Sequence, residues 1–283
     1  MKTKEVNIIC PLHNAEKYIE NFHNSLLKQK NVKINEFRYV LTESNDNTEE
    51  YLKNNNINYR KIPKKEFSHS LVREKEALES KSDIVVFVTQ DVVIEDELWL
   101  YNLIKDIDDK DIVATYSRQL TKYNNLEKYT REANYPDKEV IKSKEDIEKL
   151  GLKTFFFSDA SSAISTKVFK KLNGYDNKNL PIAEDMYIAY KIIMNGYKIK
   201  YCANSVVYHS HKFTLKEIYD RYKLTGNFFK ENSYLDQYGT TNSGSTLAKY
   251  ILKRIFQEKR FLLLFRYPFD MAARLFGMKV GKR

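Results

Sequence analysis

Short apolar runs alternate with longer amphipathic stretches over the first hundred residues. Residues 84–88 are all β-branched or aromatic, which is typical of a strand buried on both faces. Strands separated by helical stretches of 10–15 residues predict βαβ units with right-handed crossovers. We expect a parallel α/β half with strands at 5–10, 37–41, 57–62 and 84–88, the first ended by Pro11, and helices at 15–29, 48–54 and 68–79.

The pattern loosens after residue 110 and predicts a mixed second half. Residues 198–202 and 205–208 read as an antiparallel strand pair. The other expected elements are strands at 112–116, 154–158 and 163–165, a partly helical stretch at 121–150, and helices at 184–195, 214–232 and 246–277. We therefore divide the chain into an α/β domain at 1–212 and a helical region at 213–283.

The positive charge of the chain is concentrated at one end. Of the formal net charge of +10, the segment from residue 246 onward carries +8, which leaves +2 for the first 245 residues. A nucleic-acid-binding protein needs a basic face on its folded body. The nearly neutral body therefore argues against a nucleic-acid partner.

The basic C-terminal region combines its charges with apolar stripes. A basic amphipathic helix is typical of proteins that bind a membrane surface. Alternatively, the same helices pack on the body or form a dimer and leave a solvated basic face. No apolar stretch approaches the roughly 20 residues that cross a bilayer. The cations of these stripes are Lys253, Arg254, Lys259, Arg260, Arg266 and Arg274.

Two cysteines indicate the compartment. Cys10 and Cys202 lie in apolar runs without metal-binding spacing, so we expect reduced core residues of a cytosolic protein. The N-terminus leads directly into a strand and lacks the apolar core of a signal peptide.

A lone carboxylate, Asp91, follows the buried run at 84–88. Ligands of open α/β sheets bind beyond the carboxyl ends of the strands. A carboxylate there suits Mg²⁺ or Mn²⁺, which share oxygen ligands with substrate phosphates. The alternative is that Asp91 caps a helix beginning near residue 95.

Four other polar segments follow predicted strands or begin a helix. Residues 10–14 and 42–48 come after the first two strands, and each is alternatively an ordinary cap or turn. Glu184 and Asp185 begin a helix, whose dipole would also stabilise them. A His-Ser-His segment at 209–211 follows a strand. Neither GxGxxG nor GxxxxGK[ST] occurs, which argues against a dinucleotide enzyme or a P-loop NTPase.

In this order, the five segments resemble family 2 glycosyltransferases of GT-A fold over roughly residues 5–211. Residues 67–73, 89–91, 116–119, 134–136 and 156–159 are similar to the bacterial rhamnosyltransferase branch. The resemblance implies transfer of L-rhamnose from dTDP-L-rhamnose to a lipid-linked saccharide during cell-surface polysaccharide assembly. It places the enzyme in the cytoplasm, on the inner face of the plasma membrane.

The resemblance also assigns roles to residues. Thr89 replaces the first aspartate of the family's Asp-x-Asp motif, so Asp91 remains as a metal ligand, and we favour His209 over His211 as its partner. Asp185 is expected to be the general base of an inverting transfer, with Glu184 as its structural or acceptor-binding partner. The expected nucleotide-sugar contacts are Pro11, Leu12, Asn14, Glu43, Ser44, His69, Arg73, Gln90 and Asp91, and the expected acceptor contacts are Arg118 and Asp159.

Several alternatives remain open at this point. Arg73 also fits a surface salt bridge with Glu76 or Glu79, and Asp159 fits a turn. The donor is alternatively a UDP-hexose or a UDP-N-acetylhexosamine. A non-catalytic, membrane-associated scaffold that binds nucleotide sugars is the rival from another class.

Overall fold

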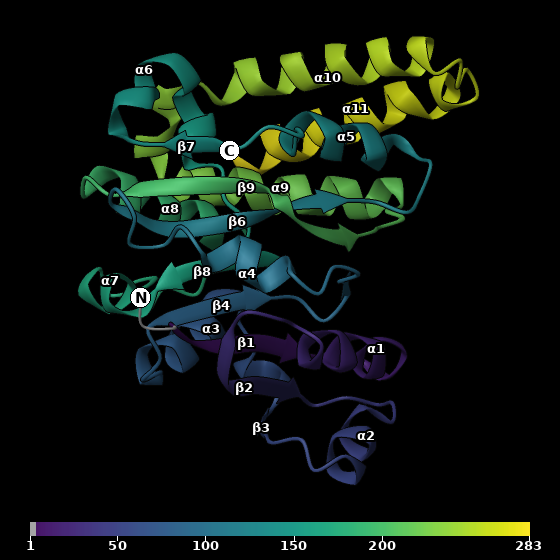
Figure 1. The fold of residues 1–283 in the computed structure, drawn as a ribbon. Coiled ribbons are helices and arrows are strands. Elements are labelled where there is room, and N and C mark those ends of the chain that lie inside the picture. The colour runs from purple at the N-terminus through teal and green to yellow at the C-terminus, as the bar shows by residue number, and fades with distance from the viewer. Residues whose placement is uncertain (1–3) are drawn as a thin grey trace.

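The computed structural model describes residues 4–283, apart from the side chains of 240–243. Residues 1–3 of the expected α/β domain lie outside the described residues. Nine strands form one sheet in the order β3-β2-β1-β4-β8-β6-β9-β5, and β7 pairs with the outer edge of β9. Figure 1 shows this sheet running through the molecule from β3 to β9, with the C-terminal helices beyond β9.

The first four large strands are parallel, as the alternating pattern predicts. β1 pairs with β2 and β4, and β2 pairs with β3, all in parallel register. The elements of this half are β1 (Glu5–Leu12), α1 (Glu16–Leu27), β2 (Lys33–Thr42), α2 (Thr48–Asn54), β3 (Tyr59–Ile62), the 3₁₀ turn η1 (Lys64–Glu66), α3 (His69–Glu79) and β4 (Ile84–Val88).

The prediction that Pro11 ends the first strand is wrong. β1 continues to Leu12, and Pro11 is in register with Val40 of β2. β4 pairs with β1 only from Val6 to Ile9. The missing N–H of Pro11 therefore leaves no ladder bond unsatisfied on the β4 side, and an extended backbone is compatible with proline.

In the second half the sheet becomes mixed because β8 runs antiparallel to both β4 and β6. Its elements are β5 (Val92–Val93), α4 (Trp99–Ile104), β6 (Ile112–Leu120), α5 (Leu126–Asn134), β7 (Val140–Lys142), η2 (Lys144–Asp146), α6 (Ile147–Leu150), η3 (Gly151–Phe155), β8 (Ser161–Ser165), α7 (Thr166–Lys171), α8 (Glu184–Met194) and β9 (Lys198–His209).

Two expectations for this half are wrong. Residues 198–202 and 205–208 belong to one strand, β9, which runs parallel to β6 with an irregularity where the register moves from Ser117–Cys202 to Arg118–Val206. A bulge therefore replaces the expected turn. Residues 154–158 form the end of η3 and a loop instead of a strand. Phe155 and Phe157 bury their rings in the core from this irregular segment, and a short apolar run does not distinguish the two cases.

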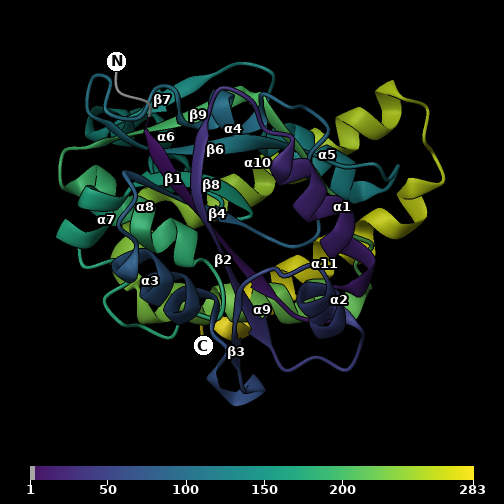
Figure 2. The same ribbon diagram turned by 60° about the horizontal axis from the view of Figure 1, so that its bottom comes forward.

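Alternate side chains of the central strands fill two separate cores. Phe87 of β4 belongs to the core that also contains Phe169 and Ile188, whereas Val86 packs with Phe22 and Trp99 on the other face. Figure 2 separates the two helical layers, with α3, α7 and α8 on one side of β1 and α1 on the other. Both faces of the parallel strands are therefore covered, as a continuously apolar strand requires.

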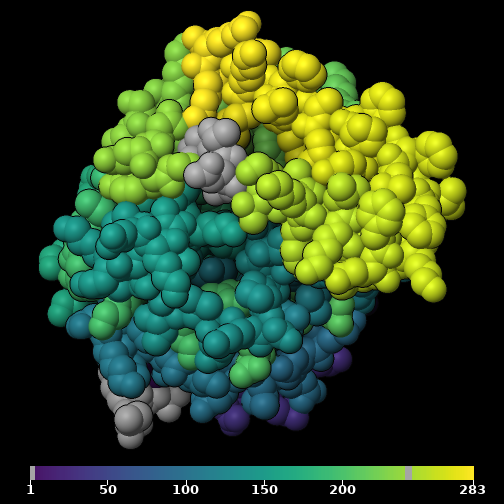
Figure 3. Space-filling model, turned by 90° about the horizontal axis from the view of Figure 1, so that it is seen from above, coloured from purple at the N-terminus to yellow at the C-terminus, as the bar shows by residue number. Residues whose placement is uncertain are grey.

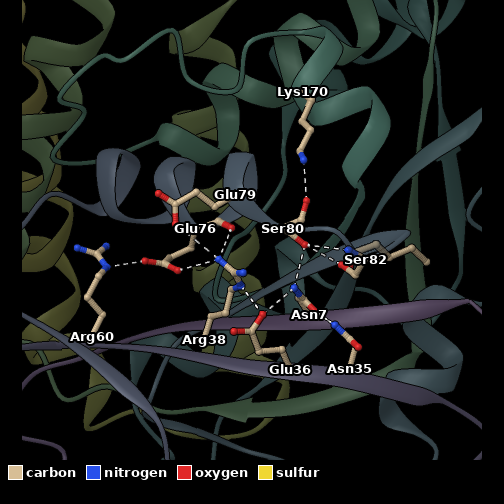
Figure 4. Close-up of polar contacts among 11 residues, drawn as sticks. Asn7, Asn35, Glu36, Arg38, Arg60, Glu76, Glu79, Ser80, Ser82 and Lys170 are labelled. Carbon is tan, nitrogen blue, oxygen red and sulfur yellow. Dashed lines mark hydrogen bonds and ion pairs between the residues drawn. The ribbon is translucent and has the colours of Figure 1, made fainter.

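A polar network fastens the end of α3 to β1 and β2 (Figure 4). The Arg38 guanidinium lies between Glu36 and Glu76, at 2.8 and 3.2 Å, and Asn7 donates to Ser80 Oγ at 3.0 Å. Since Asn7 and Ser80 are buried, these bonds satisfy groups that water cannot reach. The network lies away from the carboxyl ends of the strands and is structural.

The C-terminal region is helical, as predicted, but the helix expected at 246–277 is interrupted at residues 258–262. The elements are α9 (Leu215–Glu231), the 3₁₀ segment η4 (Ser233–Tyr238), α10 (Thr240–Gln257) and α11 (Leu263–Gly281). Phe228 and Phe229 of α9 join the core of the body. A Cβ placed on Gly277 or Gly281 of α11 would lie 2.5 or 2.0 Å from a carbonyl oxygen of α9, so only glycine permits this approach. The division at residue 212 stays a prediction.

The helices α10 and α11 form a hairpin that projects to one side of the body (Figure 3). Within residues 4–283, no helix combines the length and the apolar character needed to cross a bilayer. Two cations of the basic stripes instead tie the hairpin to the rest of the protein. Arg254 of α10 bonds Glu132 of α5 at 3.0 Å, and Arg274 of α11 donates to the Tyr222 hydroxyl of α9 at 2.8 Å.

A buried lysine of β7, Lys142, supports the end of η3. Lys142 is 3% exposed, donates to the Phe156 carbonyl, and places its ammonium 4.9 Å from the centre of the Tyr116 ring. Burial lowers the pKa of Lys142 to about 7. In the unfolded chain a lysine takes up its proton below about pH 10.4.

We expect the pH dependence of stability to reflect Lys142. Between about pH 7 and pH 10 the unfolded chain binds more protons than the folded one, so the free energy of unfolding rises with pH in this window. Urea unfolding at pH 7 and pH 9.5 should show the parent protein gaining stability relative to Lys142→Met. Lys149→Met, at an exposed position of α6, is the matched control. An equal difference between parent and Lys142→Met at both pH values would contradict the prediction.

Candidate active site

Asp91 lies where β4 ends and the chain turns into β5. The two residues of β5 pair antiparallel with the end of β9, and Val92 stands opposite His209. This pairing brings the Asp91 carboxylate to 3.5 Å from His209 Nε2 and 4.0 Å from His211 Nδ1. The alternative that Asp91 caps the following helix is wrong, because α4 begins only at Trp99.

Asp91, His209 and His211 form a cluster of candidate metal ligands. One ligand atom from each lies within 4.8 Å of the others, and the two Nε2 atoms are 2.7 Å apart. Burial lowers the pKa of both histidines, that of His211 to about 3, so both imidazoles are neutral and able to ligate. Burial alone would raise the pKa of Asp91, but the neighbouring His209, His211 and Thr89 outweigh burial and hold the pKa below its usual range. The structure thus brings together both histidines.

Gln119 orients the His209 ring through a hydrogen bond to its Nδ1 atom. Its Oε1 lies 3.0 Å from His209 Nδ1 and also accepts a hydrogen bond from Arg131, while its Nε2 donates to Ser158 Oγ at 2.8 Å. An amide oxygen only accepts, so Nδ1 carries the proton and Nε2 keeps its lone pair toward Asp91. Sequence reasoning missed this role for Gln119, although His209 and Gln119 both lie in the segments that carry the family resemblance.

The expected acceptor contact of Arg118 is not supported by its position. Successive residues of a strand point to opposite faces, and Gln119 lines the cavity beside the histidines. Arg118 is absent from that lining. Because Arg118 and Gln119 are consecutive in β6, their side chains point to opposite faces of the sheet. This alternation is the sequence signal that could have identified Gln119.

The loops after β1 and β2 interlock at the same edge of the sheet. The Asn14 N–H donates to Ser44 Oγ at 3.0 Å, and Asn14 Oδ1 accepts from the Asn45 N–H at 2.9 Å. Gln90 uses both ends of its amide on the backbone of His13, at 2.7 and 2.8 Å. Gln90 therefore fixes the first loop instead of facing a sugar.

The other residues expected at the nucleotide differ in their exposure. Leu12 is 1% exposed and therefore buried in the core, and Pro11 is half-buried. Glu43 is exposed and accepts from the Lys64 N–H at 3.1 Å. His69, at the start of α3, is half-buried, and burial followed by the charges of Arg73 and Arg221 lowers its pKa to about 4.

Arg73 belongs to a buried network instead of the surface. It is 2% exposed and donates to Glu184 Oε1 at 2.7 Å. The alternative salt bridge with Glu76 or Glu79 is therefore wrong, since Glu76 pairs with Arg38 and Arg60.

Asp159 is a member of the same network. It is 1% exposed, and its two oxygens accept from Tyr175 and Ser162 at 2.6 and 2.7 Å. The expected direct contact of Asp159 with an acceptor is wrong in this geometry, because neither oxygen reaches solvent. Asp159 instead supports Arg73, which donates to its carbonyl at 3.5 Å.

Asp185 follows Glu184 at the start of α8 and is partly exposed. Burial, and then the charges of Glu184 and Asp159, raise the pKa of Asp185 well above its usual range. Ala183 before this pair has φ 61°, a left-handed backbone that costs a non-glycine residue about 1–3 kcal/mol. A partly exposed carboxylate of raised pKa is a candidate for a general base.

A cavity of about 250 Å³ adjoins the cluster. His209, His211, Ser158 and Tyr135 are among its lining residues. Asp91 and Asp185 do not line it, but each lies near a residue that does. Asp91 contacts both histidines, and the charge of Asp185 adds to burial in raising the pKa of Tyr135 to about 12.

Comparison with known proteins shows the family of this chain. Residues 7–173 match the family model described as Glycosyl transferase family 2. The chain is 32% identical to the O-antigen chain rhamnosyltransferase RfbN of Salmonella typhimurium over 98% of this chain and 90% of that protein. It is 33% identical to the O-antigen chain rhamnosyltransferase WbaN of Salmonella anatum over 97% of this chain and 88% of that protein.

Solved structures share the fold at low sequence identity. The mannosyltransferase PcManGT of Pyrobaculum calidifontis, solved with GDP-Man and Mn²⁺, has a TM-score of 0.63 at 14% identity, over 100% of this chain and 88% of that one. S. aureus TarS in complex with UDP has a TM-score of 0.55 at 17% identity, over 97% and 90% of the two chains. The expected GT-A architecture is confirmed, and the chain is a glycosyltransferase that belongs to glycosyl transferase family 2.

Proposed function

We propose that the protein is an inverting rhamnosyltransferase that moves L-rhamnose from dTDP-L-rhamnose to a lipid-linked saccharide. The observation that carries this proposal is the similarity, over nearly the whole chain, to two O-antigen chain rhamnosyltransferases. The cluster at Asp91 and the raised pKa of Asp185 support a metal-assisted transfer with a single general base.

Asp91, His209 and His211 would hold Mg²⁺ or Mn²⁺. An ionised carboxylate and two neutral imidazoles form a donor set that suits such a cation, and Gln119 fixes the orientation of one imidazole. The bound cation would neutralise charge on the departing diphosphate. The rim formed by Asn14, Ser44 and the backbone of His13 would receive the nucleoside.

Asp185 would accept the proton of the acceptor hydroxyl as its oxygen attacks the anomeric carbon. Glu184 forms an ion pair with Arg73 at 2.7 Å and precedes Asp185 in the chain. Arg73 therefore acts through Glu184 instead of touching the nucleotide. A neighbouring negative charge strengthens a carboxylate as a base, since it disfavours a second charge nearby.

The hairpin of α10 and α11 would attach the enzyme to the cytoplasmic face of the membrane, where a lipid-linked acceptor resides. Phe261, Leu262 and Phe265 at its tip are 51%, 83% and 78% exposed, which is unusual for large apolar side chains. Lys259, Arg260 and Arg266 stand beside them in the chain. Each such cation contributes about 1 kcal/mol of attraction to an anionic surface.

We expect Asp185→Asn to lower kcat by about 10²–10⁴-fold, because the amide cannot accept the proton. The KM for dTDP-rhamnose should change little, and Asp220→Asn on the exposed face of α9 is the control. Turnover of dTDP-rhamnose by the parent and the variant tests the base. Competition between dTDP-rhamnose and UDP-glucose tests the identity of the donor. Full activity of Asp185→Asn would reject Asp185 as the base, and absence of turnover by the parent protein would support the scaffold alternative. Turnover of UDP-glucose alone would reject the rhamnose donor.

Gln119→Leu should weaken Mn²⁺ binding by about 10–100-fold, since His209 loses the partner that fixes its tautomer. Asp91→Ala should weaken it further because it removes a ligand. Titration calorimetry with Mn²⁺ in the absence of donor gives the affinities directly. Arg118→Leu, the neighbour on the opposite face of β6, serves as the matched control. The proposed metal site is rejected if Mn²⁺ binds equally to the parent and the Asp91 variant.

Replacement of Phe261, Leu262 and Phe265 by Ser should release the protein from sedimenting liposomes that contain anionic lipid. The three side chains are exposed, so the fold should be retained, as circular dichroism can check. Leu27→Ser, at a residue of α1 that is 60% exposed, removes comparable apolar surface elsewhere. Undiminished sedimentation of the triple variant would rule out attachment through the hairpin tip.

A further inference from the structure

A second cavity adjoins the first and opens toward the hairpin. Its volume is about 490 Å³, and it shares Glu127, Phe213, Ile218 and Arg274 with the cavity at the histidines. The remaining walls come from the loop after β6, the segment after β9 and the first turns of α11. The shared residues make the two cavities neighbours across a common wall.

The charges along these two cavities do not balance. Six cations line them against two carboxylates, Glu127 and Asp270. Arg131 pairs with Glu127 at 3.3 Å, Arg274 pairs with Asp270 at 2.6 Å, and Lys122 pairs with Glu95 outside the cavities at 2.6 Å. After these pairs are set aside, Lys212, Arg221 and Arg266 are the cavity cations without a carboxylate partner among the contacts above.

In the described part of the chain, no carboxylate forms an ion pair with these three side chains. Lys212 lies 4.4 Å from the centre of the Tyr123 ring, and Arg221 lies 4.9 Å from that of Phe213. Arg266 donates to the carbonyl of Phe213. All three are exposed, so a soluble anion can reach them. Lys212 and Arg266 both line the second cavity, whereas Arg221 faces the first.

The apolar surface begins where this positive segment ends. Leu263 lines the second cavity, and Phe261, Leu262 and Phe265 are exposed beside it. Along α11 and the turn before it, the molecule therefore presents a polar cavity with the histidines, then unpaired cations, then apolar side chains. This order matches that of a sugar, a phosphate linkage and a hydrocarbon chain in one amphiphile.

We propose that the second cavity binds the phosphate linkage of a lipid-linked acceptor, with Lys212 and Arg266 as its cationic contacts. This inference rests on the proposed function, since it assigns the linkage of the same acceptor whose sugar would enter the first cavity. Charge-assisted hydrogen bonds from lysine and arginine are the usual means of holding phosphate oxygens. The site would select acceptors by a feature remote from the reacting hydroxyl.

Farnesyl diphosphate is a suitable probe because it joins a diphosphate to a short hydrocarbon chain. Its binding is measured by titration calorimetry with Mn²⁺ and saturating dTDP, so that the donor site is filled. We expect the parent to bind it more tightly than either inorganic pyrophosphate or farnesol. The double variant Lys212→Ala/Arg266→Ala should bind it at least about tenfold more weakly while its affinity for dTDP stays unchanged.

Lys216→Ala provides the matched control, because Lys216 is an exposed lysine near the start of α9 that already pairs with Asp220. Equal affinity of the parent and the double variant for farnesyl diphosphate would overturn the inference. So would equal binding of pyrophosphate and farnesyl diphosphate, which would indicate a site for anions only. The measurement needs no turnover. A failure to transfer rhamnose would therefore refute the proposed function without changing the measured binding of farnesyl diphosphate.

Discussion

The short pairing between β5 and the end of β9 is the contact on which the candidate site depends. It is only two residues long, yet it places Val92 opposite His209 and so sets Asp91 beside both histidines. β9 reaches this position because it runs parallel to β6 and ends at the same edge of the sheet as β4. A carboxylate from one half of the sheet and two imidazoles from the other thus meet without any long loop.

The buried ion pair between Arg73 and Glu184 links the two halves in a second way. Arg73 comes from α3 of the parallel half and Glu184 from α8 of the mixed half, 111 residues later. Removal of one partner of such a pair costs about 3–5 kcal/mol because the other charge remains buried. The same pair therefore contributes to the stability of the fold and places Glu184 beside Asp185. The charge of Glu184 adds to burial in raising the pKa of Asp185.

The C-terminal helices combine two kinds of surface. α11 meets α9 through Gly277 and Gly281 at distances that exclude any side chain, so this contact is fixed by shape. The opposite end of the hairpin leaves Leu262 and Phe265 mostly exposed. One helix is therefore anchored at its end and exposed near its start. This explains how a region with many charges both closes the second cavity and leaves an apolar tip.

The sequence by itself determined the parallel half, the carboxylate at the end of β4, the start of α8 at Glu184 and the helical C-terminus. Each follows from local periodicity or from a residue at the end of an element, which neighbouring residues specify. It did not determine that 198–209 is one strand, that Gln119 supports His209, or that Arg73 is buried on Glu184. Gln119 and His209 are 90 residues apart, and only the register of β6 against β9 brings them together. Contacts between distant segments also decide which cations have a carboxylate partner. Arg254, for example, pairs with Glu132, which lies 122 residues away in the chain.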